Sequence, residues 1–209
     1  MINLKAAFNR AVIEGFIQEN PCKPLKRIKV PEKLPIFFTE KEFEKLISVI
    51  EDADVLDLVK FAVNTGLRQA ELINLRWSNI NFTEKILILD NNQFITKSKK
   101  IRSVPLNKTA LEVLNKRKSN FNEEFVFTYR GSKIVQDWLI HHFKKQVRKA
   151  GLRKELRFHS LRHTFATWLV QRGVSIYHVS KLLGHADVST TQIYANLVMS
   201  DLKSVVERL

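Results

Sequence analysis

The architecture of this chain follows from residues 158–194, FHSLRHTFATWLVQRGVSIYHVSKLLGHADVSTTQIY. Apolar residues recur there at helical intervals, and they are divided by residues that typically begin or end a helix. Ser160 is expected to cap a first helix, which Gly173 ends. Ser175 is expected to begin a second helix, which Gly184 ends. The stretch therefore predicts a helical fold in which short turns bring distant side chains together.

The same stretch holds a high density of groups that bind phosphate or transfer protons. His159 lies at the mouth of the first helix, and Arg162 follows about one turn later. His185 directly follows the second helix, in a turn where its ring is free to point outward. Tyr194 lies in a third helix, which we expect to begin at Ser189 through a Ser-x-x-Gln capping box.

Upstream of this stretch, two further amphipathic helices are predicted. The first begins at a capping box formed by Thr39 and Glu42, and apolar residues then follow at positions 43, 46, 47 and 50. The second ends at Thr65-Gly66. Arg68 is therefore delivered directly after a helix end, at the start of a short helix that contains Glu71.

The pattern changes to short β-type runs between residues 80 and 105. The runs at 86–89, 94–96 and 101–104 predict a small three-stranded antiparallel sheet. Thr109 is expected to cap the next helix, a longer helix is predicted over 133–150, and a last amphipathic helix over 201–209. The predicted fold class is mainly α, in the α+β sense.

The chain divides into three parts by composition. Residues 2–19 form one amphipathic helix, which cannot bury its apolar stripe alone and so is expected to end a preceding domain. Residues 21–35 hold four of the five prolines and several basic residues, which is typical of an extended linker. The predicted boundaries are 1–20, 21–35 and 36–209.

Charge points to a polyanionic partner. The 35 Lys and Arg residues against 21 Asp and Glu leave a net charge of +14, so nucleic acid is the first candidate and an anionic membrane surface the second. No apolar run or secretory leader predicts membrane insertion. Cys22 is the single cysteine, which excludes an intrachain disulfide and a thiolate metal cluster and fits a cytoplasmic location.

Cleavage of a phosphodiester without a metal needs fixed positive charge around the phosphorus. Guanidinium groups match the non-bridging oxygens with paired donors and keep their charge, so Arg68 and Arg162 are candidates for a clamp. His185 is the candidate for a further donor to these oxygens.

The same reaction needs a nucleophile and two proton transfers. Tyr194 is the candidate nucleophile, and His159 the candidate acceptor of its proton. Lys97, in a basic turn between two predicted strands, is the candidate donor of a proton to the departing sugar oxygen, with Lys99 in the same turn as the alternative.

Five motifs resemble the catalytic domain of the tyrosine recombinases, or phage-type integrases. The resemblance spans about residues 36–200 in the order and spacing of its parts. The motifs are Thr65-Gly66-Leu67-Arg68-Gln69-Ala70-Glu71-Leu72, Lys97 eight residues before Pro105, His159-Ser160-Leu161-Arg162-His163, Leu182-Leu183-Gly184-His185, and Tyr194 nine residues after His185.

The resemblance implies the fold of DNA breaking-rejoining enzymes and strand exchange through a 3′-phosphotyrosyl intermediate, with no metal or other cofactor. It implies the partners as well: double-stranded DNA and three further copies of the chain on DNA, with monomers in solution. It implies that Glu71 supports the site and that residues 2–19 are the last helix of a truncated N-terminal core-binding domain. It also favours docking of residues 201–209 on a neighbouring protomer, with folding back in cis as the alternative. The matching catalytic positions are Arg68, Lys97, His159, Arg162, His185 and Tyr194.

Other basic and aromatic residues receive more ordinary interpretations. His163 is expected to be a hydrogen-bonded structural histidine facing away from Arg162, Tyr177 a packing residue, and His141 and His142 without chemistry. The residues expected to contact DNA are Lys97, Lys99, Lys100, Arg102, Lys144, Lys145, Arg148 and Lys149.

Two alternatives remain open at the level of sequence. A non-catalytic DNA-binding regulator explains the charge but not a tyrosine together with two arginines. An enzyme similar to type IB topoisomerases has the same plan of active site but relaxes supercoils without exchanging partners.

Overall fold

The structure is a computed structural model that describes residues 2–25, 34–89, 101–118, 124–185 and 187–195. It divides into two compact units, Met1–Lys33 and Leu34–Leu209, each of which is described by itself. The predicted linker over 21–35 has its central residues, 26–33, outside the described ranges. The assignment of residues 1–20 to a truncated domain stays a prediction.

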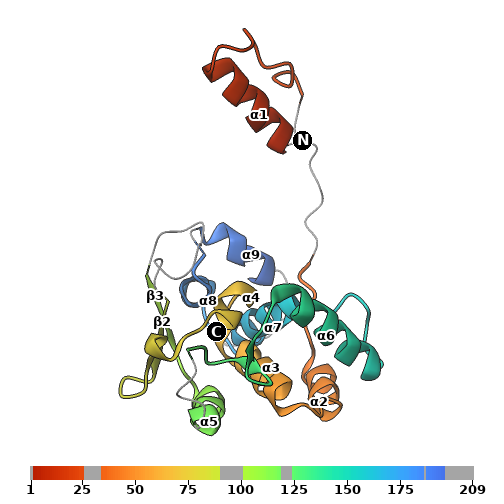
Figure 1. Cartoon of the computed structure of the whole chain (residues 1–209), viewed down its shortest axis with the longest axis vertical. Helices are drawn as coiled ribbons and strands as arrows, with labels where there is room; N and C mark the ends of the chain where they lie inside the picture. The colour runs from red at the N-terminus through yellow and green to blue at the C-terminus, as the bar shows by residue number, and fades with distance from the viewer. Residues whose placement is uncertain (1, 26–33, 90–100, 119–123, 186, 196–209) are drawn as a thin grey trace, which may run out of the picture. The chain divides into compact units, whose positions relative to one another are not determined.

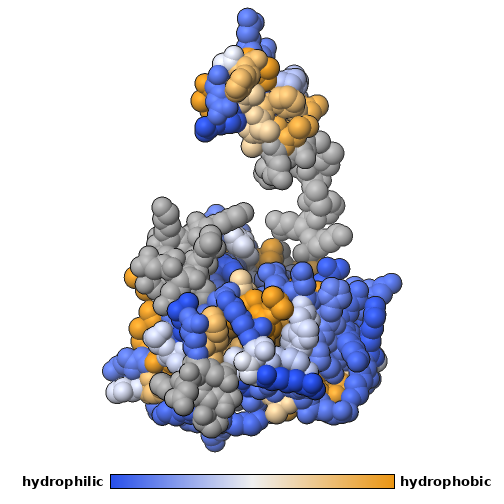
Figure 2. Space-filling view, in the orientation of Figure 1, coloured by the Kyte–Doolittle hydropathy of each residue, from blue (hydrophilic) through white to orange (hydrophobic). Residues whose placement is uncertain are grey.

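The first unit contains α1 (Ile2–Ile13), which is shorter than the helix predicted over 2–19. The helix ends early because Gly15 adopts a left-handed conformation with φ 78°. Asn20 is buried, and its side chain donates to the Lys5 carbonyl at 3.0 Å and accepts from the Cys22 backbone at 2.8 Å. The surface of the first unit also has exposed apolar side chains, which contribute to its orange areas in Figure 2. They are Leu4, Ile13, Phe16 and Leu25.

The second unit is mostly helical, as the sequence predicted. Among the described residues, α3 packs against both α5 and α7, and α8 packs against α9 (Figure 1). Phe38, Phe61, Phe127 and Phe143 are among the largest side chains buried in its core. The helices are α2 (Glu40–Ser48), α3 (Ala53–Thr65), α4 (Gln69–Ile73), α5 (Lys108–Arg117), α6 (Gln136–Lys149), α7 (Phe158–Gln171), α8 (Ile176–Leu183) and α9 (Ser189–Ala195).

A three-stranded antiparallel sheet follows α4 and the 3-10 turn η1 (Trp77–Asn79), in the order β1-β2-β3. The strands are β1 (Ile80–Asn81), β2 (Ile86–Leu89) and β3 (Arg102–Pro105), and Leu87 faces Val104 across β2 and β3. The sheet confirms the prediction, although the first strand was missed and the predicted run at 94–96 lies outside the described residues.

A second hairpin, which was not predicted from the sequence, pairs β4 (Thr128–Tyr129) with β5 (Ser132–Lys133). Its turn uses Arg130 and Gly131, both with positive φ. Because β5 occupies residue 133, the helix predicted over 133–150 begins later, at Gln136.

Helix caps decide several of the boundaries. The Thr39–Glu42 capping box is present as predicted, and Ser175 caps α8, which ends at left-handed Gly184. Two predicted caps were wrong. Asn107, rather than Thr109, caps α5 by accepting from the Ala110 backbone.

The second wrong cap concerns α7, which begins two residues before the predicted cap. Ser160 is the third residue of the helix, and its hydroxyl accepts from the backbone of Arg157 at 3.1 Å. Ser160 therefore satisfies a backbone N–H at the start of the helix from a position within the helix, and His159 lies in the first turn.

No helix among the described residues is long and apolar enough to cross a membrane.

Candidate active site

The junction between α3 and α4 positions Arg68. Gly66 ends α3 with φ +62°, and a Cβ there would lie 2.3 Å from the ring of Phe165, so the turn requires glycine. Arg68 follows with an extended backbone. Its backbone N–H donates to Glu71 Oε2 at 2.7 Å, and its Nη1 donates to Glu71 Oε1 at 2.9 Å.

Glu71 is buried, with 2% of its surface exposed, and its carboxylate binds both Arg68 and Arg102. Burial acts to raise its pKa, but Arg102, the backbone of Arg68 and the charges of Arg68 and Arg162 together hold the pKa below its usual value. The carboxylate therefore stays ionised and fixes the direction of the Arg68 side chain. The supporting role predicted for Glu71 has this contact as its physical basis.

Arg162 reaches the same place from α7 and is 4% exposed. Its Nη1 donates to the Gly66 carbonyl at 2.7 Å, and its Nη2 donates to the Leu183 carbonyl at 2.7 Å. Arg68 Nη2 lies 3.4 Å from the carbonyl of Gly184. The α3–α4 junction, α7 and the end of α8 thus meet around two guanidinium groups. Burial, with Arg68 and Arg102 nearby, lowers the pKa of Arg162 to about 9.

Arg102, which was predicted to contact DNA, bonds to Glu71 and to the end of α8. Its side chain is 12% exposed, Nη2 donates to Glu71 Oε2 at 2.7 Å, and Nη1 donates to the Leu183 carbonyl. Burial lowers its pKa, while the charge of Glu71 opposes this shift. The sequence contained a signal, since Arg102 shares a strand face with buried Val104.

The contact of Tyr194 differs from the predicted one. Its hydroxyl lies 2.8 Å from His163 Nδ1, and Tyr194 is 2% exposed. The ring of His159 meets the ring of His163 edge to face, with centroids 4.8 Å apart. His163 is therefore hydrogen-bonded, but it faces the predicted nucleophile. The positions i and i+4 of a helix share a face, so the spacing of the two histidines was the signal.

Burial and neighbouring cations control the protonation of this group. Burial raises the pKa of Tyr194, and Arg162 opposes that shift. Burial, His159, Arg162 and His185 lower the pKa of His163 to about 4. The pKa of His159 is also lowered, by burial and then by Arg162 and Arg68. These imidazoles are neutral at pH 7.

His185 follows α8, and its backbone N–H donates to the Ser180 carbonyl at 3.1 Å. Its ring is half-buried, with Nδ1 2.8 Å from the hydroxyl of Thr191 on α9, so it does not point freely outward as predicted. Burial, Arg162 and Arg68 lower its pKa to about 4. The bond to Thr191 leaves Nε2 as the ring nitrogen available to another partner.

The remaining residues that were predicted to contact DNA fall into two groups, one outside the described residues and one on α6. Lys97, Lys99 and Lys100 lie outside the described residues. Lys144, Lys145 and Arg148 are exposed on α6, where Figure 2 shows a largely hydrophilic surface. Lys149 also lies there, but it pairs with Glu51.

The aromatic and histidine side chains away from the site were interpreted with mixed success. His141 hydrogen-bonds the carbonyl of Asp137, and His142 stacks on Trp138, so both have local contacts on α6. Tyr177 was expected to be a packing residue, but 55% of its surface is exposed. Its position on the outer side of α8 explains the error.

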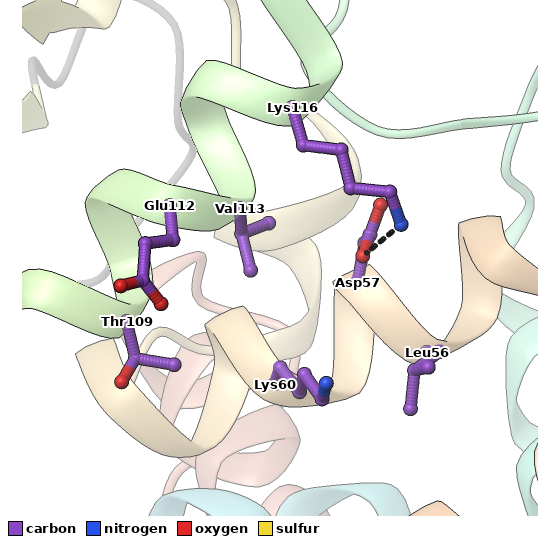
Figure 3. A pocket seen from close by; sticks show the side chains of 7 residues that line it. All are labelled: Leu56, Asp57, Lys60, Thr109, Glu112, Val113 and Lys116. Carbon is purple, nitrogen blue, oxygen red and sulfur yellow. Dashed lines mark hydrogen bonds and ion pairs between the residues drawn. The ribbon is translucent and has the colours of Figure 1, made fainter.

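A cavity of about 170 Å³ lies between α3 and α5 (Figure 3). Asp57 and Lys116, which both line it, form an ion pair with 3.0 Å between Oδ1 and Nζ. None of the predicted site residues lines it, so it is separate from the arginine cluster. Among the described residues, no group of three or more His, Cys, Asp or Glu side chains could hold a metal ion.

The arrangement of charge favours an anionic ligand. Arg68 and Arg102 bond to Glu71, and Arg162 is close enough for its charge to act on the same carboxylate. Among the described residues, this group of three guanidiniums and one carboxylate has an excess of two positive charges before any histidine is protonated. Arg68 has 36% of its side chain exposed, so part of its guanidinium group is accessible from solvent in the described part of the chain. Guanidinium groups fixed by backbone carbonyls and a carboxylate can bind phosphate oxygens with little reorganisation.

Comparison with known proteins adds independent information. The model of the phage integrase family matches residues 37–200. A tyrosine recombinase of Thermosipho africanus is 32% identical over 211 residues, which cover 99% of this chain and 73% of that protein. Tyrosine recombinase XerA of Pyrococcus furiosus is 36% identical over 215 residues, which cover 98% of this chain and 71% of that protein.

A solved structure matches the fold as well. The Tn1549 transposon integrase in complex with a circular intermediate DNA superposes with a TM-score of 0.78 at 22% identity. The superposition covers 98% of this chain and 76% of that chain. The helices and the small sheet described above therefore have the arrangement of an integrase fold.

Proposed function

This chain belongs to the phage integrase family of tyrosine recombinases, and we propose that it cleaves and rejoins DNA at specific sites through Tyr194. The observation that carries the proposal is the meeting of Arg68 and Arg162, from remote segments, around the end of α8, with Tyr194 close enough to Arg162 for that charge to act on its pKa. A DNA-binding regulator does not require a tyrosine close to an arginine cluster, and the two relatives described above are named tyrosine recombinases.

The arginines are proposed to bind the scissile phosphate. Arg162 is fixed by two backbone carbonyls and Arg68 by Glu71, so both guanidinium groups are held in place before a ligand arrives. His185 is proposed to donate from Nε2 to a non-bridging oxygen. Such fixed donors stabilise the extra negative charge of a phosphorane-like transition state.

The bond changes proposed for the reaction balance without an external energy source. The Tyr194 oxygen bonds to phosphorus and the bond to the 5′ oxygen breaks, which gives a 3′-phosphotyrosyl link and a free 5′-hydroxyl. Lys97 is proposed to protonate the departing oxygen. A 5′-hydroxyl of a partner strand then reverses these steps, and the covalent link conserves the bond energy.

Double-stranded DNA is the proposed partner, and a tetramer on DNA the proposed assembly. The patch formed by Lys144, Lys145 and Arg148 on α6 is proposed to contact the DNA backbone, which predicts a steep loss of affinity with salt. Residues 201–209 are proposed to dock on a neighbouring protomer. A cytoplasmic location is proposed from the DNA substrate and the single cysteine.

Trapping on DNA tests the proposal. A library of nicked duplexes with randomised sequence allows the cleaved fragment to diffuse away, so that the covalent intermediate accumulates. The wild-type chain is expected to form a denaturation-resistant adduct, and Tyr194→Phe none. The conservative control Tyr177→Phe, on the outer side of α8, should keep the adduct. An equal yield from Tyr194→Phe would disprove the assignment.

A further inference from the structure

The hydroxyl of Tyr194 has a specific neighbour that the predicted mechanism did not use. His163 on α7 and Tyr194 on α9 are joined by a 2.8 Å hydrogen bond, with ring centroids 5.8 Å apart. In the described part of the chain, the Tyr194 hydroxyl has no such bond with His159, the residue expected to accept its proton. His159 instead contacts the ring of His163.

The direction of the hydrogen bond follows from the two partners. A phenol O–H is a stronger donor than an imidazole N–H, and a neutral imidazole has one ring nitrogen that accepts. The phenol is protonated at neutral pH because burial raises its pKa, and His163 is neutral because its pKa is about 4. The O–H therefore points at the lone pair of Nδ1, and the Nε2–H tautomer of His163 is selected.

From this geometry we propose that His163 is the general base that takes the proton of Tyr194 during DNA cleavage. The inference rests on the proposed function and replaces His159 in that step. As the Tyr194 oxygen bonds to phosphorus, its proton moves to His163 Nδ1 and the bond to the 5′ oxygen breaks. When a 5′-hydroxyl attacks the phosphotyrosyl link, the His163 imidazolium returns the proton to the tyrosine oxygen.

The low basicity of His163 is compatible with this role because the transfer occurs in the transition state. The proton on the attacking oxygen becomes strongly acidic as the bond to phosphorus forms, and the negative charge of the phosphorane favours an imidazolium beside it. Arg162, one of the neighbours that disfavour a charged His163, would then be balanced by the phosphate. General-base catalysis of this type contributes about 10² to 10⁴ in rate.

Three substitutions in the full chain separate a base from a spacer. His163→Asn can keep a hydrogen bond to Tyr194 but cannot carry its proton, His163→Phe keeps the ring volume, and His163→Ala leaves space for added imidazole. Single-turnover cleavage is measured on a nicked duplex selected from the randomised library. We expect losses of about 10² to 10⁴ in all three variants, and recovery of His163→Ala with imidazole.

A bridging sulfur in place of the 5′ oxygen assigns the defect to the correct proton. The thiolate leaves without protonation, so this substrate relieves loss of the acid but not loss of the base. The His163 variants should remain slow on it. His178→Asn, at an exposed histidine on α8, is the matched control and should cleave at the wild-type rate on both substrates.

Each outcome decides the inference. The inference is overturned if His163→Asn cleaves at the wild-type rate, if His163→Phe cleaves faster than the wild-type chain, or if the bridging sulfur restores the rate of the His163 variants. Each of these results leaves the proposed function intact. Absence of any wild-type adduct overturns the proposed function and this inference together. A measurement without DNA is the ¹⁵N chemical shift of His163 Nδ1, which should change in Tyr194→Phe, and an unchanged shift would contradict the hydrogen bond.

Discussion

Replacing Glu71 by glutamine removes the carboxylate shared by Arg68 and Arg102 and keeps the shape of the side chain. Glu71 accepts three hydrogen bonds, two from Arg68 and one from Arg102, at 2.7 to 2.9 Å. Glutamine retains one acceptor oxygen but turns an N–H₂ group toward a guanidinium donor. The arginines lose their counter-charge in a site from which water is largely excluded.

The cost follows from this burial. Breaking a buried ion pair by removing one partner costs about 3 to 5 kcal/mol. We expect the lower end, about 3 kcal/mol, because Arg68 is partly hydrated and Arg102 keeps its bond to Leu183. For a chain of this length, the corresponding fall in Tm is about 6 to 12 °C.

Urea unfolding followed by circular dichroism measures the change in the free energy of unfolding. The matched control is Glu44→Gln on the exposed side of α2, which should change the free energy by less than about 0.5 kcal/mol. A loss below about 1 kcal/mol in Glu71→Gln, at an unchanged m value, would refute the idea that Glu71 holds the arginines together.

Two further predictions concern close packing and pH. Gly184→Ala should destabilise the fold by about 1 kcal/mol or more beyond Gly173→Ala, because both glycines have positive φ but an added Cβ at Gly184 would meet Arg102 at 2.3 Å; equal Tm values for the two variants would contradict the packing. His163 and His185 have folded pKa values of about 4 against 6.5 for the free side chain, so the unfolded chain binds protons first and stability should fall as pH drops from about 6.5 toward 4. Tm at pH 7.5 and pH 5 measures this loss, which should shrink in His163→Phe, and a flat profile would show that the imidazoles are not buried as described.

Local patterns predicted most of the helices. The Thr39–Glu42 box, the left-handed glycines after α3 and α8, and the apolar spacing of α7 act within a few residues, so the sequence alone predicts them. The cap of α7 was wrong because the Ser160 hydroxyl accepts from the Arg157 backbone as the third residue of the helix, so the helix begins at Phe158 rather than after Ser160. The β4–β5 hairpin was missed because its strands have two residues each and little β-type pattern.

The partners of charged groups could not be predicted in the same way. Arg102 was predicted to contact DNA, but its bonds to Glu71 on α4 and to the Leu183 carbonyl on α8 were not predicted. The Lys149 side chain pairs with Glu51, which precedes α3. These contacts join residues far apart in sequence, so they cannot be predicted from composition or from the spacing of residues.

The contact between His163 and Tyr194 could be predicted in part, because it depends both on a local helical pattern and on a long-range contact. The shared helix face of His159 and His163 was readable, but the place of α9 beside α7 depends on tertiary packing. Spacing thus selects the residues of a site, and the fold decides which of them touch.

The most direct test of the account is the chemical identity of the covalent adduct. The trapped complex is digested with nuclease and protease, and the peptide that carries a nucleotide is sequenced by mass spectrometry. The account predicts a nucleotide joined through its 3′ phosphate to Tyr194 and a free 5′-hydroxyl on the other fragment. A nucleotide on another residue, or a 5′ linkage, would contradict it.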